Sequence, residues 1–485
     1  MSGRVRRWGG FLAAALCAAA ASAPSAWAVS PPVVPPGPPP AGPVAPPDPT
    51  EQKSTCGAGG VLPQADFRLQ PSAEALLDLA GARLFSRGAG QKVAVIDTGV
   101  NRHPRLLALE GGGDYVSGTD GLVDCDAHGT LVAGIIAAAP GPDDAFAGVA
   151  PEATILSIRQ NSGVYAVKGS APTQNDPNAV SPGYGNLHTL ALAVARAVDL
   201  GATVINLSEV ACSPVGAGLN DAELGSALRY AYERNVVVVA AAGNLQTQGQ
   251  GLCSAQNPVH DPNLPLARDW ESVQTIASPA WFSPYVLSVA ALTTSGQPAE
   301  FSLHGPWVSV AAPGEQIVSL DPNGPGLVDA WQDPRGLVPI NGTSFSSAFV
   351  SGVVASVRSH FPALSAGEIM ELIKRTAHTG GAGPNAVVGY GVVDPIAALT
   401  YQLPPLKNVP NPDAGRRIAS PPRRDRDNRV RDIVLAVTGA CAALSLIALA
   451  VLAPRRKRRA SAEREDRDGS DAVAHADAER ADVNR

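Results

Sequence analysis

Three short stretches of the sequence contain residues whose types could form a catalytic triad. "VAVIDTGV" includes Asp97 at the end of an apolar run, "HGTLVAG" begins at His128, and "NGTSFSSAFVSG" includes Ser344. A serine hydroxyl is a poor nucleophile until a neighbouring base takes its proton, and that base needs a carboxylate to orient it. Asp97, His128 and Ser344 supply these groups in the chain order Asp, His, Ser. The sequence therefore predicts nucleophilic catalysis by a serine.

The third stretch contains four serines, and their positions in the expected helix distinguish them. Ser344 follows Gly342 and Thr343 and is expected at the N-terminus of a helix over residues 344–360. There the unpaired backbone N–H groups and the helix dipole favour a developing oxyanion. The remaining three lie further along, where small side chains permit close packing: Ser346, Ser347 and Ser351.

Two further residues bear on this chemistry. Asn244 ends "VVAAAGN" after an apolar run, and its amide could donate to the oxyanion beside the backbone N–H of Ser344. A donor of this kind contributes on the order of 3 kcal/mol. A plain turn asparagine is the alternative if this motif is taken alone. His103, in "NRHP", lies close to Asp97 in sequence and is the rival to His128 as base.

The elements that must position these residues follow an alternating pattern. Apolar strands are expected at 92–97, 154–160, 203–208, 236–243, 285–292 and 307–313, with helices at 187–201, 221–235 and 344–360 and another after the capping box Ser365–Glu368. Near-continuous Val and Ile runs between helices predict an α/β fold with a mostly parallel sheet covered on both faces. Ligands bind at the carboxyl ends of such strands, where Asp97 is expected. The insertions 160–186 and 246–283 are expected to border the site.

Both ends of the chain resemble targeting segments rather than folded core. Basic residues, an apolar run and Ala26-Trp27-Ala28 predict a signal peptide at 1–28. The apolar run 433–453 is long enough to cross a bilayer, although a buried core helix is the alternative. The basic cluster 455–459 favours a cytoplasmic tail at 454–485 and an extracytoplasmic main domain, single-pass in the cell membrane. A Pro-rich extension (29–91), a peptidase domain (92–400) and a Pro/Arg-rich linker (401–432) complete the expected organisation.

Composition argues against several classes of partner. The net charge of −6 disfavours nucleic acid, and the arginine cluster is better explained as a stop-transfer signal. No cofactor or metal is expected. An acidic stretch could hold calcium but lacks EF-hand spacing, so a solvated loop is the preferred interpretation; its members are Asp114, Asp120, Asp124 and Asp126.

Taken together, these motifs resemble the subtilisin-like serine proteases over about 92–394, and their chain order is the subtilisin order. Within that family the likeness is to the mycosins, the membrane-anchored proteases of type VII secretion systems. It rests on "DTGVNRHPRL", "NLSEVAC", "GTSFSSAFVSG", the Pro-rich segments and the C-terminal apolar run. The resemblance implies a seven-stranded parallel sheet, endopeptidase action on protein or peptide substrates, and a secretion membrane complex as partner.

Two other functions are weighed against the protease. The first is a structural subunit of the secretion complex in which proteolysis is dispensable. The second is a serine esterase, which is disfavoured because the pattern G-x-S-x-G is absent around Ser344.

The sequence departs from the subtilisin pattern at the substrate-binding segment. Ser208-Glu209-Val210 stands where many relatives have Ser-Leu-Gly, and Ala348 stands where many have Pro. In the family this segment pairs with the substrate backbone, and with Gly243 nearby it borders the pocket for the residue before the scissile bond. Val210 is expected to narrow that pocket and Glu209 to add charge, which favours small substrate residues.

Four cysteines lie in the exported part, and an even number in an oxidising compartment predicts two disulfides with three possible pairings. The extension is too short for the usual removable pro-domain, and the resemblance implies that it wraps the catalytic domain. On that basis Cys56–Cys125 is expected to hold the extension beside the cleft, and Cys212–Cys253 to join the loops on both sides of it.

Overall fold

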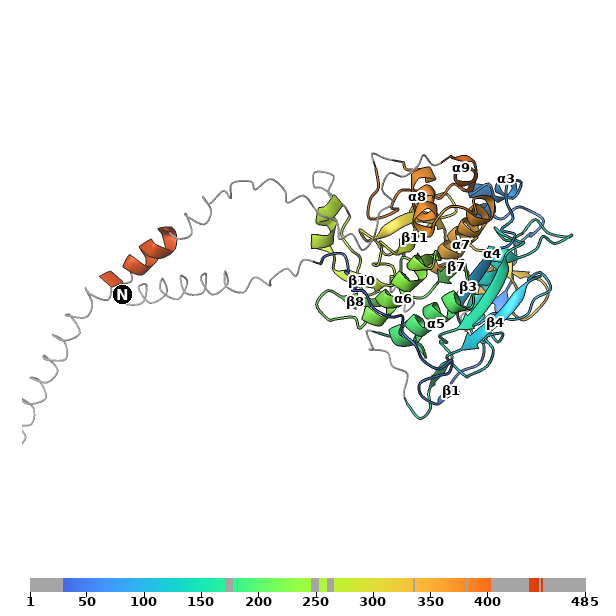
Figure 1. Ribbon diagram of the computed structural model, residues 1–485, viewed down its shortest axis with the longest axis horizontal. Coiled ribbons are helices and arrows are strands. Elements are labelled where there is room, and N and C mark those ends of the chain that lie inside the picture. The colour runs from blue at the N-terminus through green and yellow to red at the C-terminus, as the bar shows by residue number, and fades with distance from the viewer. Residues whose placement is uncertain are drawn as a thin grey trace, which may run out of the picture. The chain divides into compact units, whose positions relative to one another are not determined.

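The computed structural model describes residues 29–170, 178–180, 182–245, 253–259, 266–334, 336–380, 383–402, 436–444 and 446–447. The chain divides into two units, Met1–Gly415 and Arg416–Arg485, and the first contains the folded domain (Figure 1). The predicted signal peptide and tail, and all but the first two residues of the predicted linker, lie outside the described residues.

A seven-stranded sheet forms the centre of the first unit, and every neighbouring pair of its strands is parallel. This confirms the predicted α/β fold and its seven-stranded parallel sheet. The strand order is β12 (Val308–Pro313), β11 (Val286–Leu292), β9 (Val237–Ala241), β7 (Val204–Leu207), β3 (Lys92–Asp97), β5 (Thr154–Arg159) and β4 (Leu109–Asp114).

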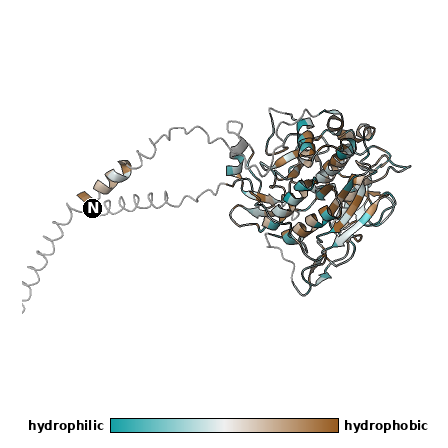
Figure 2. Ribbon diagram, viewed as in Figure 1, coloured by the Kyte–Doolittle hydropathy of each residue, from teal (hydrophilic) through white to brown (hydrophobic). Residues whose placement is uncertain are grey.

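Helices cover both faces of this sheet, because each strand sends alternate side chains to opposite sides. Val93 and Val95 of β3 pack in one core with α4 (His128–Ala137), α7 (Thr343–His360) and α8 (Ala366–Thr376). Ala94 and Ile96 pack in the other with α5 (Leu187–Asp199) and α6 (Ala222–Glu233). The apolar residues of these layers are brown in Figure 2. The predicted capping box of α8 is present, with Ser365 N donating to Glu368 Oε2 at 2.8 Å.

The segment before the sheet lies along the domain and enters its core. Val34 is buried in the α5–α6 core. Strand β1 (Thr50–Gln52) pairs with β6 (Tyr165–Val167), and β2 (Gly59–Gly60) pairs with β15 (Ala330–Asp333). The short helices α2 (Ser72–Leu76) and α3 (Leu79–Ala82) follow, and Leu77, Leu79 and Ala82 belong to the α4–α7 core.

The remaining elements are short. Strand β8 (Ala211–Pro214) pairs with β10 (Thr275–Ser278), β13 (Ser319–Leu320) pairs with β14 (Leu327–Val328), and β16 (Gly336–Pro339) pairs with β15. A 3₁₀ helix spans Leu266–Ser272, and α9 spans Pro395–Thr400. None of the described helices is long and apolar enough to span a membrane. Of the predicted span 433–453, only 436–444 and 446–447 are among the described residues.

Candidate active site

The predicted catalytic residues meet at the carboxyl edge of the central sheet. Asp97 is the last residue of β3, and Asn244 lies three residues after β9 ends. His128 is the first residue of α4, and Ser344 lies in the first turn of α7. Parallel strands end at the same edge, so strand and helix ends far apart in sequence converge there.

His128 is held by a buried carboxylate. Its Nδ1 lies 2.7 Å from Asp97 Oδ1, and Asp97 has no exposed surface. The same oxygen accepts from the backbone N–H of Thr98 at 2.7 Å. Gly129 allows α4 to begin so close to β3, because a Cβ there would lie 2.0 Å from the carbonyl oxygen of Gly99. The imidazole also packs near the ring of Phe345, with centroids 5.3 Å apart.

The charges of this pair shift both of their pKa values. Burial acts to lower the pKa of His128, but the charge of Asp97, its hydrogen bond and the charge of Glu209 outweigh burial and raise the pKa to about 10. Burial acts to raise the pKa of Asp97, but the charge and hydrogen bond of His128 keep it below its ordinary value. The arrangement therefore favours the imidazolium that forms when histidine acts as a general base.

Ser344 lies beside the segment that follows β7. Its hydroxyl donates to the carbonyl oxygen of Ser208 at 3.1 Å, not to His128, and the residue is 5% exposed. In ligand-free enzymes, catalytic hydrogen bonds often tighten only when substrate binds. The other serines of α7 are buried and bonded elsewhere: Ser346 to the carbonyl of Pro313, Ser347 to that of Ser344, and Ser351 to the amide oxygen of Asn206.

The amide of Asn244 has a fixed orientation. Its Oδ1 accepts from the backbone N–H and from the hydroxyl of Thr343, both at 3.0 Å. With the oxygen occupied by these two donors, the amide nitrogen is the atom left to donate at the start of α7. Thr343 was not singled out from the sequence, although its place one residue before the serine was a usable signal.

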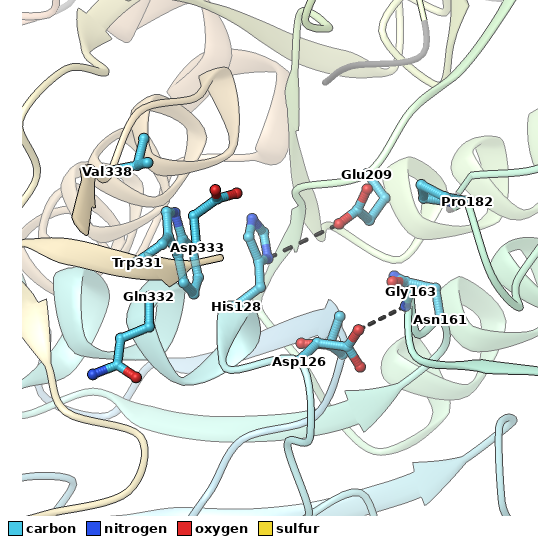
Figure 3. A pocket seen from close by; sticks show the side chains of 11 residues that line it. Asp126, His128, Asn161, Gly163, Pro182, Glu209, Trp331, Gln332, Asp333 and Val338 are labelled. Atoms are coloured by element: carbon cyan, nitrogen blue, oxygen red, sulfur yellow. Dashed lines mark hydrogen bonds and ion pairs between the residues drawn. The ribbon is translucent and has the colours of Figure 1, made fainter. Parts of the chain in front are cut away.

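A cleft of about 340 Å³ opens beside His128 (Figure 3). Glu209 projects toward the imidazole, and its Oε1 lies 3.9 Å from His128 Nδ1. Three acidic residues line the cleft: Asp126, Glu209 and Asp333. The other lining residues are Thr98, Asn161, Gly163, Pro182, Trp331, Gln332 and Val338.

Two of the substrate-binding residues predicted from the sequence, Glu209 and Val210, lie against different neighbours. Val210 lies against Gly243, since a Cβ added at Gly243 would be 3.4 Å from Val210 Cγ2 and 3.0 Å from Cys253 Sγ. Glu209 faces His128 instead. Glu209 therefore adds its charge beside His128, whereas Val210 lies against Gly243, and the effect of the two residues on substrate choice stays a prediction. Adjacent side chains of an extended segment point in opposite directions.

The acidic stretch is only in part the solvated loop that was predicted, since Asp120 is exposed but Asp114 and Asp124 are buried. Asp114 is fully buried and accepts from the hydroxyls of Ser117 and Thr119. Asp124 accepts from the hydroxyl of Thr98 and from both N–H and hydroxyl of Thr130 in the first turn of α4. These carboxylates hold the loop and the helix start from inside. Burial raises the pKa of Asp124 to about 6.

Asp126 is also bonded within the fold, and His103 has a partner other than Asp97. Asp126 accepts from the hydroxyl of Ser162 and the N–H of Gly163. His103 is buried, and its Nδ1 accepts from the backbone N–H of Arg105, so it is not the base paired with Asp97.

In the described part of the chain, one group of side chains is close enough to hold a metal ion, namely Asp97, His128 and Glu209, with ligand atoms within 4.8 Å of one another. Within this group, His128 Nδ1 and Asp97 Oδ1 already contact each other at 2.7 Å.

Two disulfides flank the site, with the pairing expected from the resemblance. Cys56 is bonded to Cys125, three residues before His128. Cys212 is bonded to Cys253, which joins the strand after Val210 to the loop after Asn244. The first bond ties the N-terminal segment beside His128, and the second ties together the segments that follow β7 and β9.

Comparison with known proteins identifies the class to which this fold and site belong. The subtilase family model matches residues 88–391. The chain therefore belongs to the subtilase family, and it is a subtilisin-like serine endopeptidase.

More similar relatives narrow the assignment. Mycosin-1 of Mycolicibacterium smegmatis is 44% identical over 448 residues, which cover 90% of this chain and 96% of that protein. Mycosin-3 of Mycobacterium tuberculosis is 42% identical, with 93% and 98% covered. Within the subtilases, the chain belongs to the mycosins.

Solved structures agree with this assignment. The crystal structure of MycP1 from Mycobacterium smegmatis has a TM-score of 0.72 and 44% identity, and the match covers 78% of this chain and 96% of that chain. A chain in the structure of an intact ESX-5 inner membrane complex has a TM-score of 0.70 and 41% identity, with 87% and 99% covered.

Proposed function

We propose that Ser344 is the nucleophile of an acyl-enzyme mechanism in which His128 is the base and Asp97 orients it. In this mechanism the proton of Ser344 Oγ passes to His128 as the oxygen attacks the substrate carbonyl carbon. The peptide C–N bond then breaks while the imidazolium protonates the leaving amine. Water, deprotonated by His128, hydrolyses the ester and regenerates the hydroxyl.

The observation that carries this proposal is the 2.7 Å contact between His128 Nδ1 and the buried carboxylate of Asp97. That contact leaves Nε2 free to take the proton of Ser344 Oγ and to pass it to the leaving amine. The oxyanion is assigned to the N–H of Ser344 at the start of α7 and to the amide of Asn244. Donors fixed before the reaction lower the barrier because they need no reorganisation as charge develops.

The test is labelling and turnover of matched serine variants. Ser344→Ala is expected to lower kcat on a peptide substrate by a factor on the order of 10⁴ to 10⁶ and to abolish labelling by a fluorophosphonate. Ser347→Ala is the matched control, because that hydroxyl donates to a carbonyl within the same helix. Mass spectrometry that places the adduct on another serine would reject the assignment.

We also propose that Val210 restricts the residue before the scissile bond to small side chains, because it lies against Gly243 in the wall of that pocket. A peptide with alanine at this position is expected to be cleaved much faster than one with phenylalanine. Val210→Gly should reduce the difference, and an unchanged ratio in that variant would refute the proposal.

We further propose that the protein works with a type VII secretion complex at the outer face of the cell membrane, anchored by 433–453. Supporting this, the match to a chain in the structure of an intact ESX-5 inner membrane complex covers 99% of that chain at 41% identity. Two disulfides also suit an extracytoplasmic compartment.

The alternative, a mainly structural subunit, is separated from the protease by one genetic comparison. A deletion strain is complemented with the wild-type gene or with Ser344→Ala, and secretion and complex assembly are measured. If proteolysis is required, only the wild type restores secretion. If the variant restores both, the essential role is structural and proteolysis is dispensable.

A further inference from the structure

The carboxylate of Glu209 lies in the substrate cleft without a hydrogen-bond donor among the described residues. Its one ion-pair contact there is with His128 Nδ1, 3.9 Å from Oε1, and that nitrogen already contacts Asp97 at 2.7 Å. The side chain keeps 23% of its surface exposed, so a ligand can reach it. A buried or half-buried carboxylate ordinarily finds a donor, and its absence leaves one acceptor open to the cleft.

The surroundings of Glu209 are acidic. Asp126 and Asp333 line the same cleft, and its described lining contains neither Lys nor Arg (Figure 3). Asp126 is engaged by Ser162 and Gly163, so it adds negative charge while its oxygens are occupied. Burial is the main cause that raises the pKa of Glu209 to about 7; the charge of His128 acts to lower it, and the charges of Asp97 and Asp126 act to raise it. Three carboxylates line the cleft against one imidazole, that of His128, so a cation entering it would find an open acceptor and a lining with more negative than positive groups.

The position of Glu209 relative to the nucleophile determines which substrate residue it meets. The carbonyl of Ser208 accepts from the Ser344 hydroxyl, and Val210 lies against Gly243, where the pocket for the residue whose carbonyl is attacked is proposed above. Glu209 points the opposite way, over His128. In an extended substrate, neighbouring side chains also alternate, so the residue just before the attacked one faces His128 and Glu209.

We propose that Glu209 is a specificity-determining residue that selects peptide substrates with Lys or Arg immediately before the residue whose carbonyl Ser344 attacks. The ammonium or guanidinium donates to the open carboxylate in a cleft whose field favours it. This inference rests on the proposed role of Ser344. A charge-assisted bond of this kind corresponds to a preference of about tenfold to a hundredfold in kcat/KM.

The experiment uses three peptides that differ only at that position, carrying Lys, norleucine or Glu. The full-length protein is compared with Glu209→Gln and Glu209→Lys, and Glu152→Gln is the control because it removes an exposed carboxylate elsewhere. The wild type and the control are expected to prefer Lys over norleucine by at least about tenfold. The preference should fall toward unity in Glu209→Gln and turn toward the Glu peptide in Glu209→Lys.

Two outcomes would overturn the proposal. One is a ratio of Lys to norleucine that is the same in the wild type and Glu209→Gln. The other is an equal loss for all three peptides, which would mean that Glu209 acts only through His128. If the variants fold poorly, the wild-type ratio is measured against ionic strength instead. It should fall as salt screens the pair, and a salt-independent ratio rejects the proposal.

The norleucine peptide separates this test from that of the nucleophile. Its cleavage by the wild type and loss in Ser344→Ala report the proposed mechanism whatever the preference for Lys. If Ser344→Ala still cleaves it, the mechanism fails. If only the Lys preference is missing, the mechanism stands and the selection by Glu209 fails.

Discussion

At the scale of residues, Thr343 fixes the orientation of the Asn244 amide, which is proposed to donate to the oxyanion. The backbone N–H and the hydroxyl of Thr343 both donate to Asn244 Oδ1. Because Thr343 directly precedes Ser344, these bonds fix the amide relative to the start of α7. An amide that must reorient during the reaction would stabilise the oxyanion less. The value of Asn244 therefore depends on Thr343 as well as on its own side chain.

Asn244→Ala is expected to lower kcat by about 10²- to 10³-fold with little change in KM, because the lost bond forms mainly in the transition state. Thr343→Val, which removes one of the two donors to the amide oxygen, should cause a smaller loss. Steady-state kinetics on one peptide measures both. A rise in KM with unchanged kcat for Asn244→Ala would assign the residue to substrate binding instead.

The pH dependence of kcat/KM should report the raised pKa of His128. The base must be neutral to take a proton, so activity rises with pH as the imidazolium loses its proton. This rise in kcat/KM, the acidic limb of the pH profile, is expected above the ordinary histidine pKa of 6.5, toward the pKa of about 10 that the nearby carboxylates produce. Glu209→Gln removes one of those charges and should move the limb to lower pH.

Glu152→Gln serves as control for this shift, because its exposed carboxylate lies outside the cleft lining. It should leave the limb in place. A limb at or below 6.5 in the wild type, or one that moves to higher pH in Glu209→Gln, would contradict the electrostatic account of this site.

At the scale of elements, the junction of β3 and α4 sets the distance between carboxylate and base. Gly129 follows His128, and the backbone of Gly99 occupies the space that a side chain at position 129 would need. Gly129→Ala is therefore expected to lower the free energy of unfolding by about 3 kcal/mol and to reduce turnover by displacing His128. Gly326→Ala is the control, since a Cβ there meets nothing within 4 Å.

Denaturant unfolding measures the first effect and peptide kinetics the second. If Gly129→Ala matched the wild type in both, the close approach of α4 to β3 would not be what places the base.

Most of the strands of the central sheet could be predicted from the sequence, because they are buried on both faces and appear as continuous apolar runs. Strand β4 escaped notice since "LEGGGD" has no such run. The buried role of Asp114 rests on donors only three and five residues later, Ser117 and Thr119, a local signal that the sequence analysis did not use. The role of Asp124 was missed because one of its donors, Thr98, lies 26 residues earlier and comes near only on folding. The direction of Glu209 was missed for the same reason, since it depends on which side of an extended segment faces His128.

At the scale of the whole molecule, the N-terminal segment is tied to the catalytic domain in three ways. Its strands pair with β6 and β15, its apolar residues enter both cores, and Cys56 is bonded to Cys125. Strands of two or three residues supply few backbone bonds, so the covalent link carries much of the attachment near the cleft. Because Cys125 precedes His128 by three residues, this link also restrains the loop that leads into α4.

Replacing both Cys56 and Cys125 with Ser should lower the free energy of unfolding by up to about 4 kcal/mol, because the bond closes a loop with a sequence separation of 69 and limits the unfolded chain. Denaturant unfolding of the purified protein measures this, and Cys441→Ser, outside both disulfides, is the control. The double variant should also lose activity before global unfolding, as the loop before His128 becomes less restrained. An unchanged unfolding midpoint would show that strand pairing and core contacts alone hold the segment.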